Sequence, residues 1–477
     1  MDKRRIMTTV AGALLAGCSF APTYHVPSTT ISAAYKEAGS WQVAQPSDRI
    51  ERDSWWKVYH DPELDRLEPL VATANPDVQA AVARHDEAIA YEHQAESSLY
   101  PTLGADAQVT RNRQSERRPL RFGAVMPSSY DANLAELAFD YDLDLWGKVR
   151  NEVAASKAQS EAAADDLGSL RLSLQANLAE AYWRLRGLDE QAQVLADTID
   201  TYRRALRLTV SRRAGGISSD LDVSRAQTQL AAAKAQAEDV KAQRALEEHA
   251  IAALTGTSAS TFALNPSDAL SYLPSVPAGM PGTLLERRPD VAAAERRVAA
   301  ANAQIGVARA AYFPDISLGI AGGFESDKFS PWFAAPEEMW SLGPTLAQTL
   351  FDGGLRRAKT AEARAQLAQY SANYRSTVIK AIQQVEDNLA LEHHLGDEAM
   401  REDEALDASK HTLDLSMSQY RDGVVSYLDV VTAQTTELQT QLVTVSLQTR
   451  RLLATVGLIE ALGGGWNAPS RVVNMSP

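Results

Sequence analysis

The chain is poor in cysteine, in basic residues and in long apolar runs, and each shortage excludes a class of protein. Cys18 is its single cysteine, so no disulfide forms within the chain. Its 47 lysines and arginines are outnumbered by 61 aspartates and glutamates, which gives a net charge of −14. This balance argues against a nucleic-acid partner, which requires a basic face. Beyond residue 17 no apolar run reaches the roughly 18 residues of a transmembrane helix, so we expect none in the mature chain.

Motifs of nucleotide- and metal-dependent enzymes are missing as well. There is no GxxxxGKS/T loop, no GxGxxG fingerprint and no HExxH helix. His393 and His394 stand beside Glu392, and His85 and His93 lie two helical turns apart. Neither group has further ligands at a metal-binding spacing. We therefore expect no catalytic residue and no metal, and no cofactor other than the covalent lipid considered next.

The N-terminus has the pattern of an export signal. Basic residues at 3–5 precede a short apolar stretch that ends with residues 15–18 (LAGC). A small-residue site ending in cysteine resembles a bacterial lipobox, in which the cysteine is acylated; an ordinary signal peptide or a buried thiol is the alternative. Ser19 follows Cys18, whereas an aspartate there would resemble an inner-membrane retention signal. We expect residues 1–17 to be removed and a lipid such as palmitate on Cys18 to anchor the protein in the outer membrane.

The rest of the chain contains the same pattern twice. Residues 76–78 (PDV) recur at 289–291, and the GISS sequence that starts at Gly216 corresponds to GVVS at Gly423. The matches keep their order and nearly their spacing, which indicates a tandem duplication. We expect each half to contain a helix, a short extended region, a very long helix, a glycine turn and a returning helix.

Two proline-free blocks, 147–265 and 345–468, are rich in strong helix formers. In the first block apolar residues recur at steps of three and four, which is coiled-coil spacing, although a plain helical bundle gives the same pattern. One helix over 148–213 would span about 100 Å. The apolar series comprises Leu167, Leu170, Leu174, Leu178, Ala181, Leu185, Leu188, Ala192, Leu195, Ile199, Tyr202 and Leu206.

Between the helical parts the pattern changes to strict alternation. Apolar side chains alternate with mostly acidic ones in 135–145, and with small or polar ones in 316–321 and 340–350. This period of two indicates strands with one apolar face, and a soluble sandwich is one explanation. Each half, however, holds a single hairpin, at about 103–145 and about 316–350. Its strands of roughly ten residues are long enough to cross a bilayer when tilted.

Four strands cannot close into a barrel by themselves. A membrane does not tolerate an open sheet edge, so copies of the chain must combine. Two copies would give about eight strands around an interior filled by side chains, whereas three would give about twelve strands and a water-filled lumen. Acidic residues on the polar face favour the larger barrel, and hence a homotrimer.

A set of short motifs resembles one known family. The motifs are LAGC at 15–18, RRPDV at 287–291, AYFP at 311–314, LFDGG at 350–354 and Tyr420-x-x-Gly423-x-x-Ser426-x-Leu428-Asp429-Val430. Together they are similar to the outer-membrane efflux proteins, in the lipoprotein branch that serves tripartite pumps of the resistance-nodulation-division (RND) type. The resemblance implies a mainly α fold with membrane β. In that fold a trimeric 12-strand β-barrel, with four strands per chain, continues into a long periplasmic α-helical coiled-coil barrel.

The expected domain order combines the repeat with this resemblance. A signal peptide precedes a lipid-anchored extension, repeat 1, a linker, repeat 2 and a tail, and the family's equatorial collar would use parts of 38–70, 256–285 and the tail. The boundaries are 1–17, 18–75, 76–265 (hairpin about 103–145, long helix 148–213, helix 219–255), 266–288, 289–461 (hairpin about 316–350, long helix 354–421, helix 426–461) and 462–477.

The resemblance also implies a function. The protein would be the outer-membrane channel of a tripartite efflux pump, a passive gated exit duct for small molecules and not an enzyme. Its partners would be a periplasmic adaptor, an inner-membrane RND-type transporter and outer-membrane lipid. The alternative is a non-conducting periplasmic coiled-coil structural lipoprotein, which explains the anchor and the heptads but not the hairpins or the repeat.

The turns that end the long helices are candidates for a periplasmic gate. Each turn reverses at glycine, which adopts positive φ without steric cost. In the family the second turn narrows to an iris held by acidic residues and a tyrosine-centred network, and Tyr420 and Asp429 match those positions. Three copies of Asp429 would form an anionic ring that favours cations; a helix-start aspartate near the positive dipole end is the structural alternative. Asp222 is the repeat equivalent of Asp429.

Residues beside the turns complete the candidate site. Arg213 and Arg421 could tie neighbouring coils to acidic groups, with each exposed pair contributing about 0–1 kcal/mol. The tips of the turns are small and flat, and we expect them to contact the adaptor. The tip residues are Gly215, Gly216, Ser219, Gly423 and Ser426.

Overall fold

The computed structural model describes residues 19–29, 35–38, 54–115, 129–267, 273–274, 288–330 and 332–464, and the structural statements below concern these residues. The expected leader, the anchor Cys18, most of the 266–288 linker and nearly all of the 462–477 tail lie outside them. The chain divides into two compact units. Unit 1 comprises Met1–Pro27, His85–Ala163 and Ala294–Tyr374, and unit 2 comprises Ser28–Arg84, Ala164–Ala293 and Arg375–Pro477.

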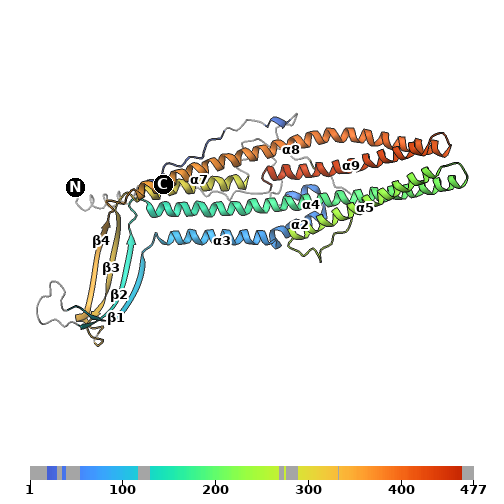
Figure 1. Ribbon diagram of the computed structural model, residues 1–477. Helices are drawn as coiled ribbons and strands as arrows, with labels where there is room; N and C mark the ends of the chain where they lie inside the picture. Colours follow the sequence, from blue (N-terminus) through green and yellow to red (C-terminus); the bar gives the residue numbers. More distant parts are fainter. Residues whose placement is uncertain are drawn as a thin grey trace. The chain divides into compact units, whose positions relative to one another are not determined.

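Unit 1 contains one four-stranded antiparallel sheet (Figure 1). Its strands, in spatial order, are β1 (Thr102–Arg113), β2 (Ser129–Asp142), β3 (Asp315–Ser326) and β4 (Glu338–Ala347). Repeat 1 supplies β1 and β2, repeat 2 supplies β3 and β4, and the pairing of β2 with β3 joins the repeats. Within the described residues, the outer edges of β1 and β4 pair with no strand.

The strand register brings apolar side chains of both repeats onto one face of the sheet. Leu103 lies opposite Phe139, Phe139 opposite Ile320, and Ile320 opposite Leu342. Directly opposite residues share a face, so these four form an apolar row across all four strands. The neighbouring row on the other face is polar or small and comprises Thr102, Asp140, Gly319 and Gly343. The alternation seen in each repeat is therefore continuous through the whole sheet.

Each hairpin ends a few residues before its long helix, because an aspartate organises the helix start. The carboxylate of Asp144 accepts hydrogen bonds from the backbone N–H groups of Val149 and Arg150, both at 3.0 Å. In the second half Asp352 plays a similar part, because its carboxylate accepts hydrogen bonds from the backbone N–H groups of Gly354 at 2.9 Å and Arg356 at 3.2 Å. These carboxylates satisfy helix-start donors that would otherwise lack partners, so the residues beside them leave the strand ladder.

Six helices form three pairs of equal length, with one member from each repeat. The leading helices, of 22 residues, are α3 (Pro76–Ser97) and α7 (Pro289–Ala310). The long helices, of 67 residues, are α4 (Lys148–Ala214) and α8 (Leu355–Arg421). The returning helices, of 35 residues, are α5 (Asp220–Leu254) and α9 (Tyr427–Ala461). The equal lengths agree with a duplicated chain.

Two elements of unit 2 are not anticipated by the sequence pattern, a 3-10 turn, η2 (Trp55–Tyr59), and a helix, α2 (Pro62–Ala74). The proline that opens α2 stands where a missing N–H costs nothing, and Asp61 caps this end by accepting two backbone hydrogen bonds. The ring of Tyr59, fully buried, lies 5.2 Å from the ring of Trp183 on α4. Burial of the aromatic side chains of η2, together with Leu64, Leu67 and Val71 at helical spacing on one face of α2, therefore holds this segment.

The apolar series of α4 packs as a coiled coil in unit 2. Leu188 and Leu195 form one buried cluster with Val240 of α5 and Leu438 of α9. One heptad further, Tyr202 packs in a second buried cluster on α5. Its hydroxyl donates a hydrogen bond of 3.0 Å to a backbone carbonyl of α9. This recurrence every seven residues is knobs-into-holes spacing.

Among the described helices, α9 meets the length and composition of a membrane-crossing helix, with a mean hydropathy of 1.2 in its most apolar window. Half of that window is buried inside the structure. Its side chains pack against α4 and α5, as in the core helix of a soluble bundle. The apolar character of α9 is thus explained by packing.

Candidate gate at the two helical turns

Both long helices end in the same glycine-closed turn, and both turns belong to unit 2. Gly216 and Gly423 adopt φ values of 73° and 77°. After each glycine, the next residue donates its N–H to a carbonyl one turn back in the long helix, from Ile217 at 2.8 Å and from Val424 at 2.9 Å. This is the Schellman arrangement, which satisfies the last carbonyls and requires a left-handed residue. Glycine therefore serves the predicted role at both positions.

The returning helices begin with a serine and an aspartate three residues later. Ser219 caps α5: its Oγ accepts the N–H of Asp222 at 3.2 Å, and the Asp222 carboxylate accepts the N–H of Ser219 at 3.1 Å. At α9 the Asp429 carboxylate accepts two hydrogen bonds from Ser426, one from its backbone N–H at 3.0 Å and one from its hydroxyl at 2.7 Å. In the single chain both aspartates therefore stabilise helix starts, which is the structural role weighed for Asp429.

The two aspartates differ in their surroundings. Asp429 is exposed, whereas Asp222 is half-buried and also accepts a hydrogen bond of 3.2 Å from the Ser218 hydroxyl. Burial would raise the pKa of Asp222, but the hydrogen bonds from Ser219 and Ser218, together with Arg225, outweigh it and lower that pKa. Asp222 is thus held ionised inside the turn, and Asp429 is the carboxylate left facing solvent.

Tyr420 links the two turns. Its side chain is buried, only 4% exposed, and its hydroxyl lies 3.1 Å from the Ser218 Oγ, which in turn bonds Asp222. Its ring lies 5.2 Å from that of Tyr427 in a buried cluster with Ala226. Burial, more than any neighbouring charge, raises the pKa of Tyr427 to about 12. The second long helix is thereby tied to the first turn by a chain of neutral and charged hydrogen bonds.

Arg212 makes a second connection between the turns, which sequence reasoning missed. Its guanidinium lies 4.9 Å from the centre of the Tyr420 ring, and its Nη1 donates a hydrogen bond of 2.9 Å to the backbone carbonyl of Arg421. A cation over an aromatic ring contributes about 0.5–2 kcal/mol, depending on how far it is desolvated. The repeat hides this contact, because Arg212 and Ser218 correspond to Gln419 and Val425 in the second half.

The two arginines chosen from the sequence behave differently from Arg212. Arg213 pairs with Asp220 at 2.5 Å, across its own turn and with both side chains largely exposed. Within the described part of the chain, the Arg421 side chain forms no ion pair, and its contribution is the carbonyl that Arg212 binds. In the single chain neither arginine side chain bridges the two repeats; that contact belongs to Arg212.

The tips carry apolar side chains as well as the small residues that the sequence singled out. Ile217 and Val424, which follow the turn glycines, are 68% and 72% exposed. Leu221 and Leu428, in the first turn of the returning helices, are 57% and 48% exposed. Both pairs are repeat equivalents, so each tip presents the same two-residue apolar patch. The repeat alignment was the signal that would have identified these residues.

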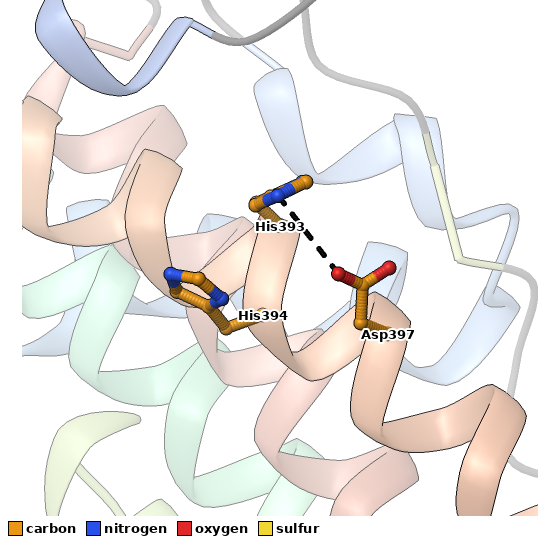
Figure 2. A group of neighbouring side chains, drawn as sticks. All are labelled: His393, His394 and Asp397. Carbon is orange, nitrogen blue, oxygen red and sulfur yellow. Dashed lines mark ion pairs between the residues drawn. The ribbon is translucent and has the colours of Figure 1, made fainter.

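A group of possible metal ligands lies on α8, away from the turns. Figure 2 shows His393, His394 and Asp397, whose ligand atoms lie within 4.8 Å of one another. The third member is Asp397, one turn after His393, and not the neighbouring Glu392, which is half-buried and whose pKa is raised by that burial. All three side chains are exposed and project from one helix, as on a solvated helix face.

Comparison with known proteins agrees with this architecture. The family model of the outer membrane efflux proteins matches residues 69–257 and 280–464. The outer membrane protein OprJ of Pseudomonas aeruginosa is 32% identical over 461 residues, 95% of this chain and 94% of OprJ. The toluene efflux pump outer membrane protein TtgC of Pseudomonas putida is 28% identical over 468 residues, 98% of this chain and 96% of TtgC.

Solved structures agree at the level of the fold. A membrane protein from Pseudomonas aeruginosa superimposes with a TM-score of 0.86 at 30% identity, over 96% of this chain and 100% of that one. The outer-membrane channel OprN gives 0.85 at 29% identity, over 94% and 100%. These matches argue against the non-conducting coiled-coil lipoprotein. The chain belongs to the outer membrane efflux protein family and is the outer-membrane channel component of an efflux pump.

Proposed function

We propose that three copies of the chain join their sheets edge to edge into one twelve-stranded barrel. The observation that carries this proposal is the sheet itself, whose β1 and β4 edges lack partners among the described strands and whose one face is apolar across all four strands. Open edges are too costly in hydrocarbon, and pairing β1 of one copy with β4 of the next removes them. The apolar face would contact lipid and the face with Asp140 would line the lumen.

The lumen serves as a passive exit duct for small molecules. Acidic residues at 106, 136 and 140 share the polar face of the sheet, which suits a water-filled passage that attracts cations. No step in this transport needs a catalytic residue, a metal or a diffusible cofactor. The energy comes from an inner-membrane transporter of the RND type, and a covalent lipid on Cys18 holds the protein in the outer membrane.

The tips of the turns are the contact for the periplasmic adaptor. The exposed pairs Ile217 with Leu221 and Val424 with Leu428 give each tip an apolar patch beside backbone that carries no large side chain at Gly216 or Gly423. Small apolar patches with polar surroundings are typical of helical contacts between proteins. Since both tips of one chain present equivalent patches, one chain offers two similar contacts to the adaptor.

Opening of the gate requires only the exchange of weak contacts. The links from Tyr420 to Ser218 and from Arg212 to the Arg421 carbonyl hold the second turn against the first. Each such link contributes about 1 kcal/mol. An adaptor that supplies competing contacts at the tips can therefore release the second turn without covalent chemistry. Asp429, exposed at the same turn, would then form the narrowest charged ring.

Single-channel conductance of the purified mature protein in planar bilayers tests this function. We expect a small cation-selective conductance in the wild type, and a larger, less selective one in Asp429→Ala. The matched control is Asp422→Ala, which removes the same charge from the same turn but not from the helix cap. A conducting channel with the same selectivity in both variants would reject Asp429 as the gate residue. Failure of the wild type to insert would reject the barrel.

A further inference from the structure

The residues that follow the expected lipid site form an ordered strap on unit 1. We define the strap as Ser19–Val26. Three side chains of α7, spaced seven residues apart on one face, bind it. Arg309 donates to the Phe20 carbonyl at 3.1 Å and Asn302 to the Pro22 carbonyl at 2.8 Å. Tyr24 donates to the Glu295 carboxylate at 2.5 Å. Alternate residues of the strap are therefore held along the helix.

An aromatic stack fixes the end of the strap nearest the lipid site. The ring of Phe20 lies 4.4 Å from that of Phe313 and nearly parallel to it, at 5°. Phe313 stacks in turn on Trp146 at 4.9 Å, and the indole N–H of Trp146 donates to the Pro314 carbonyl at 2.8 Å. Trp146 precedes the long helix of repeat 1, and Phe313 precedes the first strand of repeat 2. Phe20 thus joins the strand–helix junctions of both repeats.

The groove beneath the strap is shaped for it. A Cβ at Gly306 would lie 2.6 Å from the Asn151 side chain and 2.9 Å from Ala21, so only glycine admits the strap here. Asn151 in turn accepts a hydrogen bond of 3.0 Å from the Ser19 hydroxyl. Such close packing between Ala21 and Gly306 is typical of a protein interior and not of a loosely attached tail.

Exposed aromatic and apolar side chains mark the same end of the sheet. Tyr100 precedes β1, Tyr312 precedes β3, and Leu350 and Phe351 follow β4, with exposed fractions of 70%, 44%, 90% and 89%. The antiparallel register puts the start of β1, the start of β3 and the end of β4 at the same end of the sheet. We call these four residues the belt. The aromatic side chains among them are of the kind that forms girdles at the boundary between lipid headgroups and hydrocarbon.

We infer that the strap is a positioning device that holds the acylated N-terminus at the height of the belt, so that lipid and sheet enter the same leaflet together. This inference rests on the lipid anchor of the proposed function. Phe20 is the second residue after Cys18, and an extended residue spans at most about 3.5 Å. Holding Phe20 against Phe313 therefore fixes the level at which the acyl chains leave the protein to within about 7 Å.

The consequence is a coupling between the lipid and Phe20 during insertion. An anchor held at the correct height raises the effective concentration of the sheet at the bilayer, whereas an anchor on a free tether does so much less. Phe20 is a positioning residue in this account, and its effect should depend on the lipid. A purely structural Phe20 would matter equally with and without the acyl group.

A double-mutant cycle tests this coupling. The four proteins are wild type, Phe20→Ala, Cys18→Ser exported with a non-lipoprotein signal peptide, and the double variant. Each is transferred from detergent into liposomes, and the rate at which the strands become protease-protected is followed. We expect Phe20→Ala to slow insertion by about tenfold in the acylated protein and by less than about twofold without the lipid. Val26→Ala, in the same strap but more than half exposed, is the control.

A second variant and three further outcomes complete the test of the coupling between Phe20 and the lipid. Arg309→Ala, which removes the hydrogen bond that also holds Phe20 in place, should slow insertion in the same lipid-dependent way. This variant tests the inference if Phe20→Ala does not fold. Equal slowing of insertion in the acylated and non-acylated proteins overturns the inference. A wild type that carries no acyl group overturns both the lipid anchor and this inference. Because insertion is read from protease protection, a channel that inserts but does not conduct would contradict only the proposed function.

Discussion

At the scale of single residues, the structure separates side chains that the sequence presents as equals. Arg212 and Arg213 are neighbours, yet Arg212 bridges the two turns through Tyr420 and the Arg421 carbonyl, while Arg213 pairs across its own turn in solvent. Asp222 and Asp429 are repeat equivalents, yet one is half-buried in a hydrogen-bond chain and the other is exposed. Chemical type was readable from the sequence, but the partner of each side chain was not.

Tyr420→Phe should loosen the gate. The change removes the hydroxyl that lies 3.1 Å from Ser218 while it keeps the ring under Arg212. Loss of one such hydrogen bond costs about 1 kcal/mol, which corresponds to roughly a fivefold shift toward the open state. Single-channel recordings of Tyr420→Phe should show a higher open probability than the wild type. The control is Tyr91→Phe, at an exposed tyrosine on α3, which should leave the open probability unchanged. An unchanged open probability in Tyr420→Phe would remove Tyr420 from the gate.

Glu68→Gln should remove a pH dependence of stability in unit 2. Glu68 is fully buried, neither of its carboxylate oxygens has a hydrogen-bond partner, and burial raises its pKa well above the ordinary value of 4.5. Between that value and the raised pKa the folded protein binds the proton and the unfolded chain does not. Stability is therefore fully present below about pH 4.5 and falls as the pH rises.

Thermal unfolding of both proteins between pH 4 and pH 9 measures this effect. The midpoint of the wild type should fall with pH relative to that of Glu68→Gln, because the amide never ionises. Glu87→Gln, on the exposed face of α3, should follow the wild type at every pH. Parallel curves for wild type and Glu68→Gln would show that the buried carboxyl does not titrate in this range.

At the scale of elements, glycines with the same backbone conformation do different work. Gly216 and Gly256 have φ values of 73° and 68°. A Cβ at Gly216 would meet no atom within 4 Å, whereas at Gly256 it would lie 2.3 Å from the carbonyl oxygen of Ala74, at the end of α2. The first glycine serves a turn alone, and the second also permits α2 to approach the end of α5.

Replacing each of these two glycines by alanine separates the two costs. Gly216→Ala should destabilise the protein by about 1 kcal/mol, the cost of positive φ for a residue with a Cβ. Gly256→Ala should cost several times more, because a backbone atom must move in addition to that strain. Chemical denaturation followed by circular dichroism gives both values. Equal losses would mean that α2 yields freely at this contact.

At the scale of the whole molecule, the alternation of side chains in the sheet decides where the chain meets lipid. Leu137 lies on the apolar face and Ala138 on the polar face, although they are adjacent in β2. Leu137→Arg should oppose insertion by about 2–4 kcal/mol if the residue lies near the middle of the bilayer. Ala138→Arg should insert normally, because its side chain faces the proposed lumen.

The difference in insertion between the two variants is measured by isolating the outer-membrane fraction. The oligomer in that fraction is then identified by its altered gel mobility when the sample is not heated. The pair is matched, because both variants add the same charge at neighbouring positions of one strand. Normal assembly of Leu137→Arg together with failure of Ala138→Arg would reverse the two faces of the barrel. Failure of both would show that this part of β2 tolerates no arginine on either face.

Much of this protein could be read from its sequence, and the reason is physical. Long proline-free segments with heptad spacing, glycines at the turns and a strict alternation in the strands are local signals, and local signals fix the helices, turns and strands. The repeat added a check, because each signal occurs twice. The alternation of a single hairpin did not distinguish a barrel from a soluble sandwich. Strand length and the need to close four open strands favoured the barrel, and the family resemblance agreed with it.

The tertiary structure decided what depends on residues far apart in the chain. The helix α2 forms although Pro69 lies inside it, because α2 buries apolar side chains and η2 packs the ring of Tyr59 against Trp183 of α4. Arg212 meets Tyr420, and Phe20 meets Phe313, only because packing brings distant segments together. The sequence by itself determined the elements and their order, since these follow from neighbours along the chain. The partners within the gate and the strap were set by packing, which no local pattern encodes.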